Sequence, residues 1–413
     1  MKNLFRLLLF VIGVISCIHA TTESLVYSFT FSGCEFKPTI SVIPYNGTLY
    51  GVTPGDGCQN NSPGAKGAVY SVTTTGTTFT SLWSVPASSA TPLDHPTGIT
   101  FDSSGNIFGT SSGSILIGEN FGTVWELTES GSSWTENTLY TFTGGTDGNG
   151  PYGGVVIDSS GNLYGTTGAG GQSNGNGYGT VYKLTKSGST YTESIVHAFN
   201  NTDGANPYGP LLLVVSAGCN VLYGTTQNGG AHSDGTVFSL TDCSSGQTFK
   251  SLYSFKGGTT DGANPAGGVV VIGPNLIGLT NLGGANNTGT VYKIGLCATC
   301  GGIESVIYSF GTCNPDGCYP VGGTLTADSS GNLYGTTSSG GLGDGAVFKL
   351  TLNADSSYTE SVIHSFTGST SDGRRPQGTL GAISGTYYGT TVYGGANTNC
   401  DGNDCGSVFS IVP

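Results

Sequence analysis

One sequence unit recurs seven times along this 413-residue chain. Its clearest copy is Leu163-Tyr164-Gly165-Thr166-Thr167. The equivalent residues are spaced by 58, 56, 59, 54, 57 and 54 positions, and they are Tyr50, Phe108, Tyr164, Tyr223, Ile277, Tyr334 and Tyr388. A nearly constant period of this length, about 56 residues, is typical of a supersecondary unit that is stacked repeatedly around a shared core. The repeat therefore predicts one domain over residues 21–413.

The first 20 residues have the pattern of an export signal. Lys2 and Arg6 precede the apolar run from Leu7 to Ile18, which is short for a membrane span. Cleavage after Ala20 is expected, and lipid attachment at Cys17 is the alternative. We predict a secreted or cell-surface protein with no transmembrane segment.

The charge of the remaining chain restricts its partners. Without Lys2 and Arg6, 10 basic residues face 25 acidic ones, a formal net charge of −15. Such an acidic chain is not expected to bind nucleic acid. We expect a monomer whose partner is an extracellular glycan or protein, and no cofactor is predicted.

Ten cysteines follow the signal, an even number that is typical of disulfides in an exported protein. Short sequence separations favour five local pairs, although the connectivity stays open. These pairs are Cys34–Cys58, Cys219–Cys243, Cys297–Cys300, Cys313–Cys318 and Cys400–Cys405. The spacing of Cys297 and Cys300 also allows a redox pair.

Each unit contains the signals of four strands and no helical periodicity. In the third unit these are Gly153–Ile157, Leu163–Thr167, Gly179–Leu184 and Ser194–Phe199, called strands A to D. Asp158-Ser159-Ser160-Gly161-Asn162 is a turn sequence between A and B. Seven such units predict an all-β fold, a seven-bladed β-propeller with four antiparallel strands per blade. A β-solenoid is the alternative, but its coils are shorter.

Both ends of the chain favour a closed ring. Ser24–Phe29 has the pattern of a D strand without preceding A, B and C strands, and Gly406–Ile411 ends the chain as a C strand. We therefore predict that the N-terminal strand completes the seventh blade, which removes two exposed sheet edges. Strand C carries an aromatic residue in every unit, which predicts a core between blades. These residues are Tyr70, Trp125, Tyr182, Phe238, Tyr292, Phe348 and Phe409.

Two loop motifs are predicted on the face of the ring formed by the B–C and D–A loops. The first is Asp-Gly-x-x-Pro, whose acidic residues are Asp147, Asp203, Asp261, Asp316 and Asp372. These carboxylates are candidates to bind calcium or a polyhydroxylated ligand, while turn formation is the stronger reading. The second motif is a glycine pair after strand B. Asp401 and Asp404 are a weaker candidate calcium site.

Catalytic residues are scarce. His95 and His232 lie in predicted loops beside Asp94 and Asp234, which is the best arrangement for a lyase or hydrolase. His197 and His364 replace a tyrosine or tryptophan in strand D and are interpreted as packing residues. No nucleophile elbow, zinc spacing or phosphate loop occurs. An enzyme is therefore the less favoured class.

The boxes Leu163–Thr167, Gly179–Leu184 and Asp203-Gly204-Ala205-Asn206-Pro207 together resemble the Gloeobacter–Verrucomicrobia type of extracellular tandem repeat. The resemblance covers nearly the whole chain and implies an exported repeat protein without an established activity. We expect a non-catalytic binding or scaffolding module. A propeller-type lyase or hydrolase and a structural surface protein are the alternatives.

Overall fold

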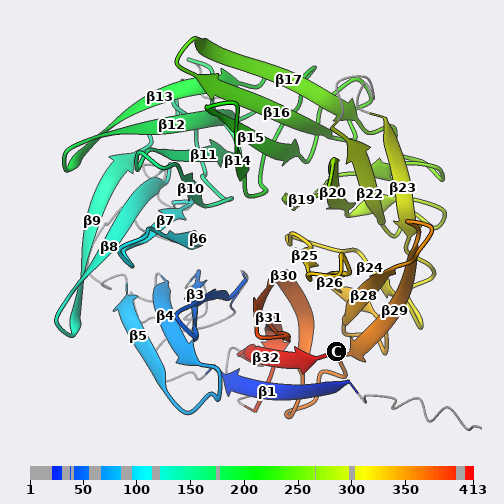
Figure 1. Cartoon of the computed structure of the whole chain (residues 1–413). Helices are drawn as coiled ribbons and strands as arrows, with labels where there is room; N and C mark the ends of the chain where they lie inside the picture. Colours follow the sequence, from blue (N-terminus) through cyan, green and yellow to red (C-terminus); the bar gives the residue numbers. More distant parts are fainter. Residues whose placement is uncertain are drawn as a thin grey trace, which may run out of the picture.

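A computed structural model shows seven four-stranded antiparallel sheets arranged around one axis (Figure 1). The structure describes residues 21–29, 38, 41–54, 67–84, 95–113, 121–173, 177–265, 267–296, 303–396 and 405–413. No helix occurs in these ranges. The predicted seven-bladed propeller is confirmed, and the β-solenoid alternative is wrong.

The first three blades follow one another along the chain, each built from four consecutive strands. Blade 1 consists of β2 (Ile43–Tyr45), β3 (Thr48–Thr53), β4 (Ala68–Thr73) and β5 (Phe79–Ser84). Blade 2 consists of β6 (Pro96–Phe101), β7 (Ile107–Ser111), β8 (Thr123–Ser130) and β9 (Ser133–Thr141). Blade 3 consists of β10 (Val155–Ile157), β11 (Leu163–Thr167), β12 (Thr180–Ser187) and β13 (Thr190–Ala198).

The next three blades repeat this order, and two of them carry a short additional strand pair. Blade 4 consists of β14 (Leu212–Ser216), β15 (Cys219–Thr226), β16 (Thr236–Cys243) and β17 (Gly246–Ser254). Blade 5 consists of β19 (Val269–Ile272), β20 (Asn275–Thr280), β22 (Thr290–Gly295) and β23 (Glu304–Ser309). Blade 6 consists of β25 (Thr326–Ala327), β26 (Leu333–Thr337), β28 (Ala346–Leu352) and β29 (Tyr358–Ser365). The additional pairs are β18 (Gly262–Ala263) with β21 (Leu282–Gly283), and β24 (Gly317–Cys318) with β27 (Ser339–Gly340).

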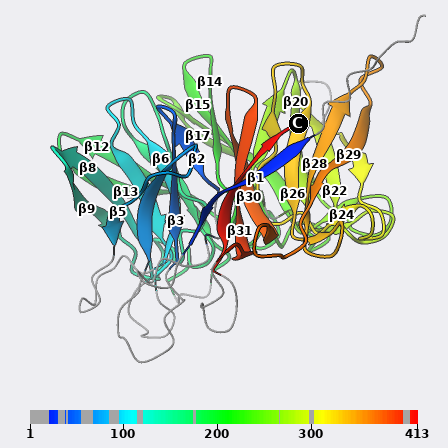
Figure 2. The same cartoon turned by 90° about the horizontal axis from the view of Figure 1, so that it is seen from below.

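Blade 7 joins the two ends of the chain. It contains β30 (Gly373–Ile383), β31 (Thr386–Gly394), β32 (Ser407–Val412) and β1 (Thr22–Ser28). Strand β1 pairs antiparallel with β32, with Glu23 opposite Ile411. Figures 1 and 2 show these two strands side by side at the ring closure. The predicted closure by the N-terminal strand is confirmed.

The sequence of the third unit determines its turns as well as its strands. Strand β11 has the predicted limits, whereas β10 is shorter than predicted and β13 begins earlier. The Asp158 Oδ1 atom accepts hydrogen bonds of 2.9 Å from the amides of both Ser160 and Asn162. Asp102 and Asp328 hold the corresponding turns of blades 2 and 6 in the same way. The side-chain turn chemistry expected of this sequence is therefore present.

Seven apolar clusters lie between neighbouring blades, one at each interface. The strand-C aromatic residues are all buried in them, each at most 1% exposed. Tyr182, for example, packs with Phe108, Phe142 and Leu163, which belong to blades 2 and 3. The prediction that these residues form the core between blades is confirmed.

The glycine after the central residue of strand B makes room for this aromatic core. A Cβ atom on Gly224 would lie 2.5 Å from Cζ of Phe238, its partner on the adjacent strand of the same sheet. Gly165 stands in the same relation to Tyr182. The glycine thus accommodates a ring from its own blade.

Substitution of Gly224 by alanine is expected to destabilise the ring by about 1–3 kcal/mol, because the new methyl group overpacks Phe238 and Leu211. Gly145→Ala is the matched control, since its Cβ would meet only Thr143 Oγ1 at an ordinary 3.7 Å. Urea unfolding of both variants measures the difference. Equal stability of the two variants would contradict this packing argument.

Two predicted disulfides are confirmed, Cys219–Cys243 and Cys313–Cys318. Cys405 is disulfide-bonded and fully buried, and its predicted partner Cys400 lies outside the described residues. Cys34–Cys58, Cys297–Cys300 and residues 1–20, with Cys17, also lie outside them. Across the described ranges, no helix is long and apolar enough to cross a bilayer.

Candidate functional site

The two predicted loop motifs lie on one face of the ring and pair with each other through backbone hydrogen bonds. Backbone bridges join Asn149 to Ala169 in blade 3 and Ala205 to Asn228 in blade 4. The β18–β21 and β24–β27 pairs are the equivalents in blades 5 and 6. This loop face, which includes β24, is at the bottom of Figure 2.

The glycine pairs on this face have a structural role. The first glycine of each pair has a φ between 75° and 92°, a left-handed conformation that favours glycine. A Cβ atom on Gly170 would lie 2.6 Å from Cα of Gly148. The other first glycines are equally confined by the Asp-Gly segment of their own blade, and they are Gly229, Gly283, Gly340 and Gly394. Close packing against the Asp-Gly backbone therefore explains the first glycine of each pair. The glycine of Asp-Gly-x-x-Pro is confined instead by a strand-B threonine side chain, as Gly148 is by Thr167.

The aspartates of this motif hold the D–A loops. Asp147, at 7% exposure, accepts hydrogen bonds from Tyr140 Oη and from the amide of Thr143. Asp203, Asp261 and Asp372 likewise accept from a strand-D side chain and from an amide three to five residues earlier. Asp316 lies against Gly311 at the equivalent place. These hydrogen bonds already use carboxylate oxygens of four of the five aspartates. Ligand binding by the five carboxylates stays a prediction.

His197 and His364 take the place of the strand-D tyrosine in this arrangement. His197 Nε2 lies 3.0 Å from Asp203 Oδ2, and its ring stacks on Phe249 with centroids 3.6 Å apart. Burial lowers the pKa of His197, against the opposing effect of Asp203. His364 Nε2 lies 3.2 Å from Asp372 Oδ1. Packing explains His197, whereas His364 lies beside Glu23 of β1 as well as Asp372.

The candidate catalytic histidines come from loops two blades apart. His95 directly precedes Pro96 at the start of blade 2, and His232 is exposed in the B–C loop of blade 4 beside Asp234. Asp94 lies outside the described residues, as do the candidate calcium ligands Asp401 and Asp404. A catalytic role of His95 and His232 stays a prediction.

Exposed tyrosines gather on the loop face at blades 3 and 4. Tyr152, Tyr178 and Tyr208 are 42%, 38% and 37% exposed, and no other Phe, Trp or Tyr of the described residues is as open to solvent. The Tyr152 and Tyr208 rings meet edge to face with centroids 5.1 Å apart. The carbonyl of Tyr178 accepts the amide of Asn206, two residues before Tyr208. We call these three residues the tyrosine cluster.

Two residues of the tyrosine cluster, Tyr152 and Tyr208, border the centre of the ring. A cavity of about 550 Å³ lies on the propeller axis and receives residues from all seven blades. Tyr152 and Tyr208 line it from the loops just before their A strands, together with Thr97, Thr324 and Thr379. Apolar walls with a few hydroxyl groups are typical of a pocket for a small molecule or a sugar ring.

The loop face also carries the only arginines that follow residue 20, Arg374 and Arg375 at the start of blade 7. Their guanidinium groups lie 4.9 Å and 5.6 Å from the ring centroid of Tyr393, in reach of cation–π attraction. Arg375 is exposed and has no ion-pair partner among the described residues. A paired arginine surface on an acidic protein is suited to carboxylate or sulfate groups.

The opposite face has a polar hollow of about 460 Å³ between blades 3 and 4. Tyr164 Oη donates to Asp242 Oδ2 at 2.7 Å, and Lys183 Nζ lies 2.7 Å from the same oxygen. Burial opposes ionisation of Asp242, but Lys183 and Tyr164 outweigh it and keep the pKa of that carboxyl below its usual range. The acid and the base of this hollow therefore neutralise each other, which does not favour proton transfer.

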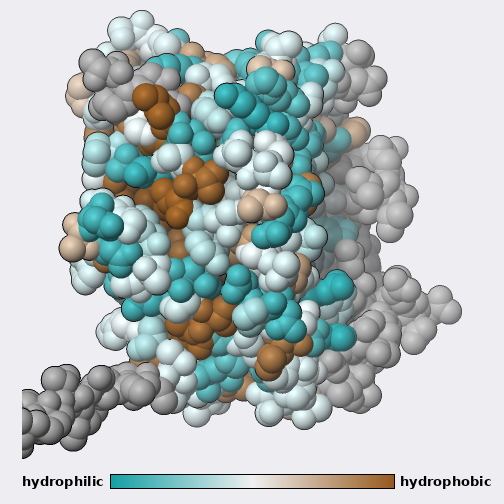
Figure 3. All heavy atoms as spheres, turned by 90° about the vertical axis from the view of Figure 1, so that its right-hand side faces the viewer, coloured by the Kyte–Doolittle hydropathy of each residue, from teal (hydrophilic) through white to brown (hydrophobic). Residues whose placement is uncertain are grey.

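On the outer side of blades 5 and 6, the residues that the structure describes form no large apolar face. Figure 3 shows this side as mostly hydrophilic, with apolar side chains in separate small patches. Scattered apolar residues of this kind are normal on a protein surface. The loop face with its tyrosine cluster is therefore the better candidate for recognition.

The fold and the loop face together define the class of protein. It is a disulfide-containing seven-bladed propeller whose axial cavity is lined by tyrosines on the loop face. The chain belongs to the Gloeobacter/Verrucomicrobia repeat family, whose model matches residues 37–292 and 175–409. A comparison with curated protein sequences gives no match.

Two solved structures of low identity, with TM-scores of 0.54 and 0.50, are similar in fold to this chain. An ancestral GH74 enzyme is 11% identical with a TM-score of 0.54, over 92% of this chain and 48% of that one. The extracellular domain of a protein described as a one-component system from B. thetaiotaomicron is 8% identical with a TM-score of 0.50, over 93% and 39%. A protein of unknown function from Dyadobacter fermentans is 14% identical with a TM-score of 0.42, over 83% and 98%. At these identities the likeness concerns the fold alone.

Proposed function

We propose that this protein is an extracellular glycan-binding module and that the tyrosine cluster is its principal contact surface. The observation that carries the proposal is the position of two of the three exposed tyrosines, Tyr152 and Tyr208, at the axial cavity. A flat ring with a polar edge provides apolar contact area and a hydrogen-bonding group at a small entropic cost. Sugars present the matching combination of apolar C–H faces and hydroxyl groups.

Several other features support this proposal. The two confirmed disulfides suit an oxidising compartment. Arg374 and Arg375 provide a second contact region for an acidic sugar on the same face. The aspartates and glycine pairs hold the loops rigidly, which limits the ordering cost of binding.

Replacing Tyr152 and Tyr208 by alanine is expected to weaken glycan binding about tenfold or more, because tyrosines at the centre of an interface commonly contribute over 1 kcal/mol each. Binding of residues 21–413 to a glycan array with neutral and uronate-containing chains is the measurement. Tyr191→Ala is the control, since Tyr191 lies near the C–D turn of blade 3, away from the loop face.

The outcomes separate the classes of function. Binding without turnover, lost in the double variant and retained in the control, supports the module. Product formation from a bound polysaccharide would support the lyase or hydrolase alternative. No binding by a folded protein, or equal binding by all three forms, would contradict the proposed role of the tyrosine cluster.

A further inference from the structure

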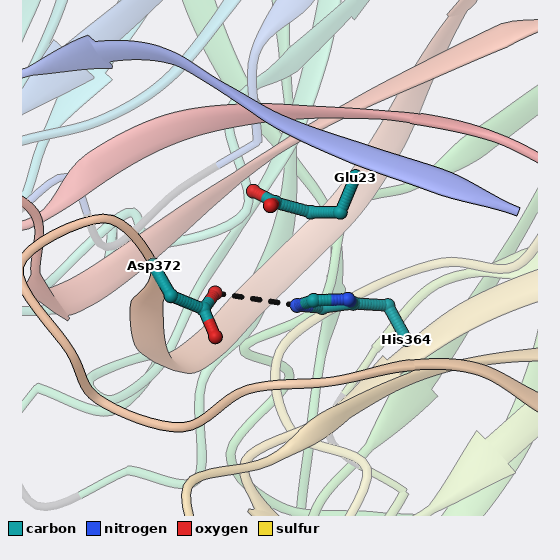
Figure 4. A group of neighbouring side chains, drawn as sticks. All are labelled: Glu23, His364 and Asp372. Atoms are coloured by element: carbon teal, nitrogen blue, oxygen red, sulfur yellow. Dashed lines mark hydrogen bonds and ion pairs between the residues drawn. The ribbon is translucent and has the colours of Figure 1, made fainter.

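A group of three potential metal ligands lies where the ring closes. Glu23 belongs to β1, His364 to β29 of blade 6, and Asp372 to the loop before β30 of blade 7. One ligand atom of each lies within 4.8 Å of the other two. Figure 4 shows the three side chains pointing toward one another from these separate segments.

The repeats provide an internal comparison for this group. At three other interfaces a glutamate at the position of Glu23 faces an aspartate and a tyrosine of the preceding blade. These sets are Glu193 with Asp147 and Tyr140, Glu304 with Asp261 and Tyr253, and Glu360 with Asp316 and Tyr308. His197 stands in the tyrosine position of blade 3, but there Phe249 replaces the glutamate. Among the described residues, only the closure interface combines a histidine with both carboxylates.

One ligand atom of the closure group lacks a partner. Glu23 Oε1 is fully buried and makes no hydrogen bond. The equivalent oxygens of Glu193, Glu304 and Glu360 also lack a hydrogen bond. At the closure, however, a cation placed between Glu23 Oε1, His364 and Asp372 would satisfy the oxygen and would have the imidazole ligand that those three interfaces lack. The 3.2 Å between His364 Nε2 and Asp372 Oδ1 is close to the ligand spacing of about 3.3 Å in a tetrahedral site with bonds of about 2.0 Å.

We propose that Glu23, His364 and Asp372 form a binding site for a divalent cation of the zinc type. An imidazole nitrogen with two carboxylates suits zinc, whereas calcium prefers oxygen ligands only. The cation would replace the proton between His364 and Asp372, and water would complete its coordination. Because Glu23 lies on β1, the bound ion would tie the closing strand to blades 6 and 7. This inference is independent of the proposed glycan binding.

The test is calorimetric titration of untagged residues 21–413 with zinc chloride, accompanied by thermal melting. We expect one saturable site and a higher melting temperature in zinc. His364→Tyr is the matched variant, because tyrosine occupies this position at three other interfaces and the ring should fold unchanged. In this variant and in Glu23→Gln, affinity should fall at least about tenfold, as for lost metal-site contacts. Calcium chloride should leave all forms unchanged.

A gain of binding provides a second, independent arm. Tyr253→His places a histidine beside Asp261 and Glu304, which recreates the closure group at the interface of blades 4 and 5. We expect the zinc stoichiometry to rise from one to two. Equal zinc binding by the unaltered chain and His364→Tyr, or a stoichiometry that stays at one in Tyr253→His, would overturn the assignment.

Discussion

Deletion of residues 21–30 is expected to cost more than about 5 kcal/mol of unfolding free energy, because it removes the whole of β1 and the core residue Phe29. Phe29 is fully buried and packs against Tyr70 with ring centroids 5.2 Å apart. Tyr27 stacks on Phe79 of blade 1. One deletion therefore damages the interface of blades 7 and 1 and exposes the edge of β32 at the same time.

Urea unfolding and size-exclusion chromatography measure these two effects. The deleted chain should unfold at lower urea and associate through its free β32 edge. A synthetic peptide of residues 21–30 should restore much of the loss by adding the missing strand. Phe29→Ala separates packing from strand pairing, with an expected cost of about 3–5 kcal/mol. An unchanged unfolding midpoint after deletion would refute closure by β1.

The architecture was predictable because the recurring sequence boxes mark equivalent strands and turns of the units. The Leu-Tyr-Gly-Thr-Thr box marks strand B, and the turn from Asp158 to Asn162 marks its beginning. The unmatched strands at the two ends then required a shared blade. The ring that faces Gly224 could not be assigned from the sequence, because the pattern does not indicate on which sheet this ring lies.

The candidate sites were less predictable, because the loop residues that recur along the repeat have a structural role. The residues of the candidate sites are instead those that differ from unit to unit. The Asp-Gly motif recurs since each loop needs the same hydrogen bonds, as at Asp147. Tyr152 and Tyr208 follow the motif directly, and their deviation from the other units was the available signal. The group at Glu23 joins residues more than 340 positions apart, so only ring closure brings them together.

Three glutamates face the Asp-Gly aspartates of the neighbouring loops and are expected to make the unfolding free energy depend on pH. Burial, reinforced by Asp147, raises the pKa of Glu193 to about 7. Burial and then Asp261 raise the pKa of Glu304 to about 7 against an opposing effect of Lys256, and burial with Asp316 raises that of Glu360 to about 7 against a hydrogen bond with Tyr308. One oxygen of each side chain is buried without a hydrogen bond. The folded chain therefore binds protons here that the unfolded chain releases at lower pH.

We expect the unfolding free energy to be about 3 kcal/mol larger at pH 5 than at pH 8, from roughly 1 kcal/mol for each glutamate after allowance for solvent screening. Because the pKa values of these glutamates are higher in the folded chain than in the unfolded chain, their contribution to the unfolding free energy is fully present below about pH 4.5. This contribution is lost as the pH rises toward 7. His197, whose pKa is lowered, opposes this trend by a single group. Urea unfolding at both pH values is the measurement. The variant with Glu193→Gln, Glu304→Gln and Glu360→Gln mimics the protonated state. It should therefore gain stability at pH 8 and lose most of the pH dependence of its unfolding free energy. If its unfolding free energy changes with pH as much as that of the unaltered chain, these interfaces do not take up protons on folding.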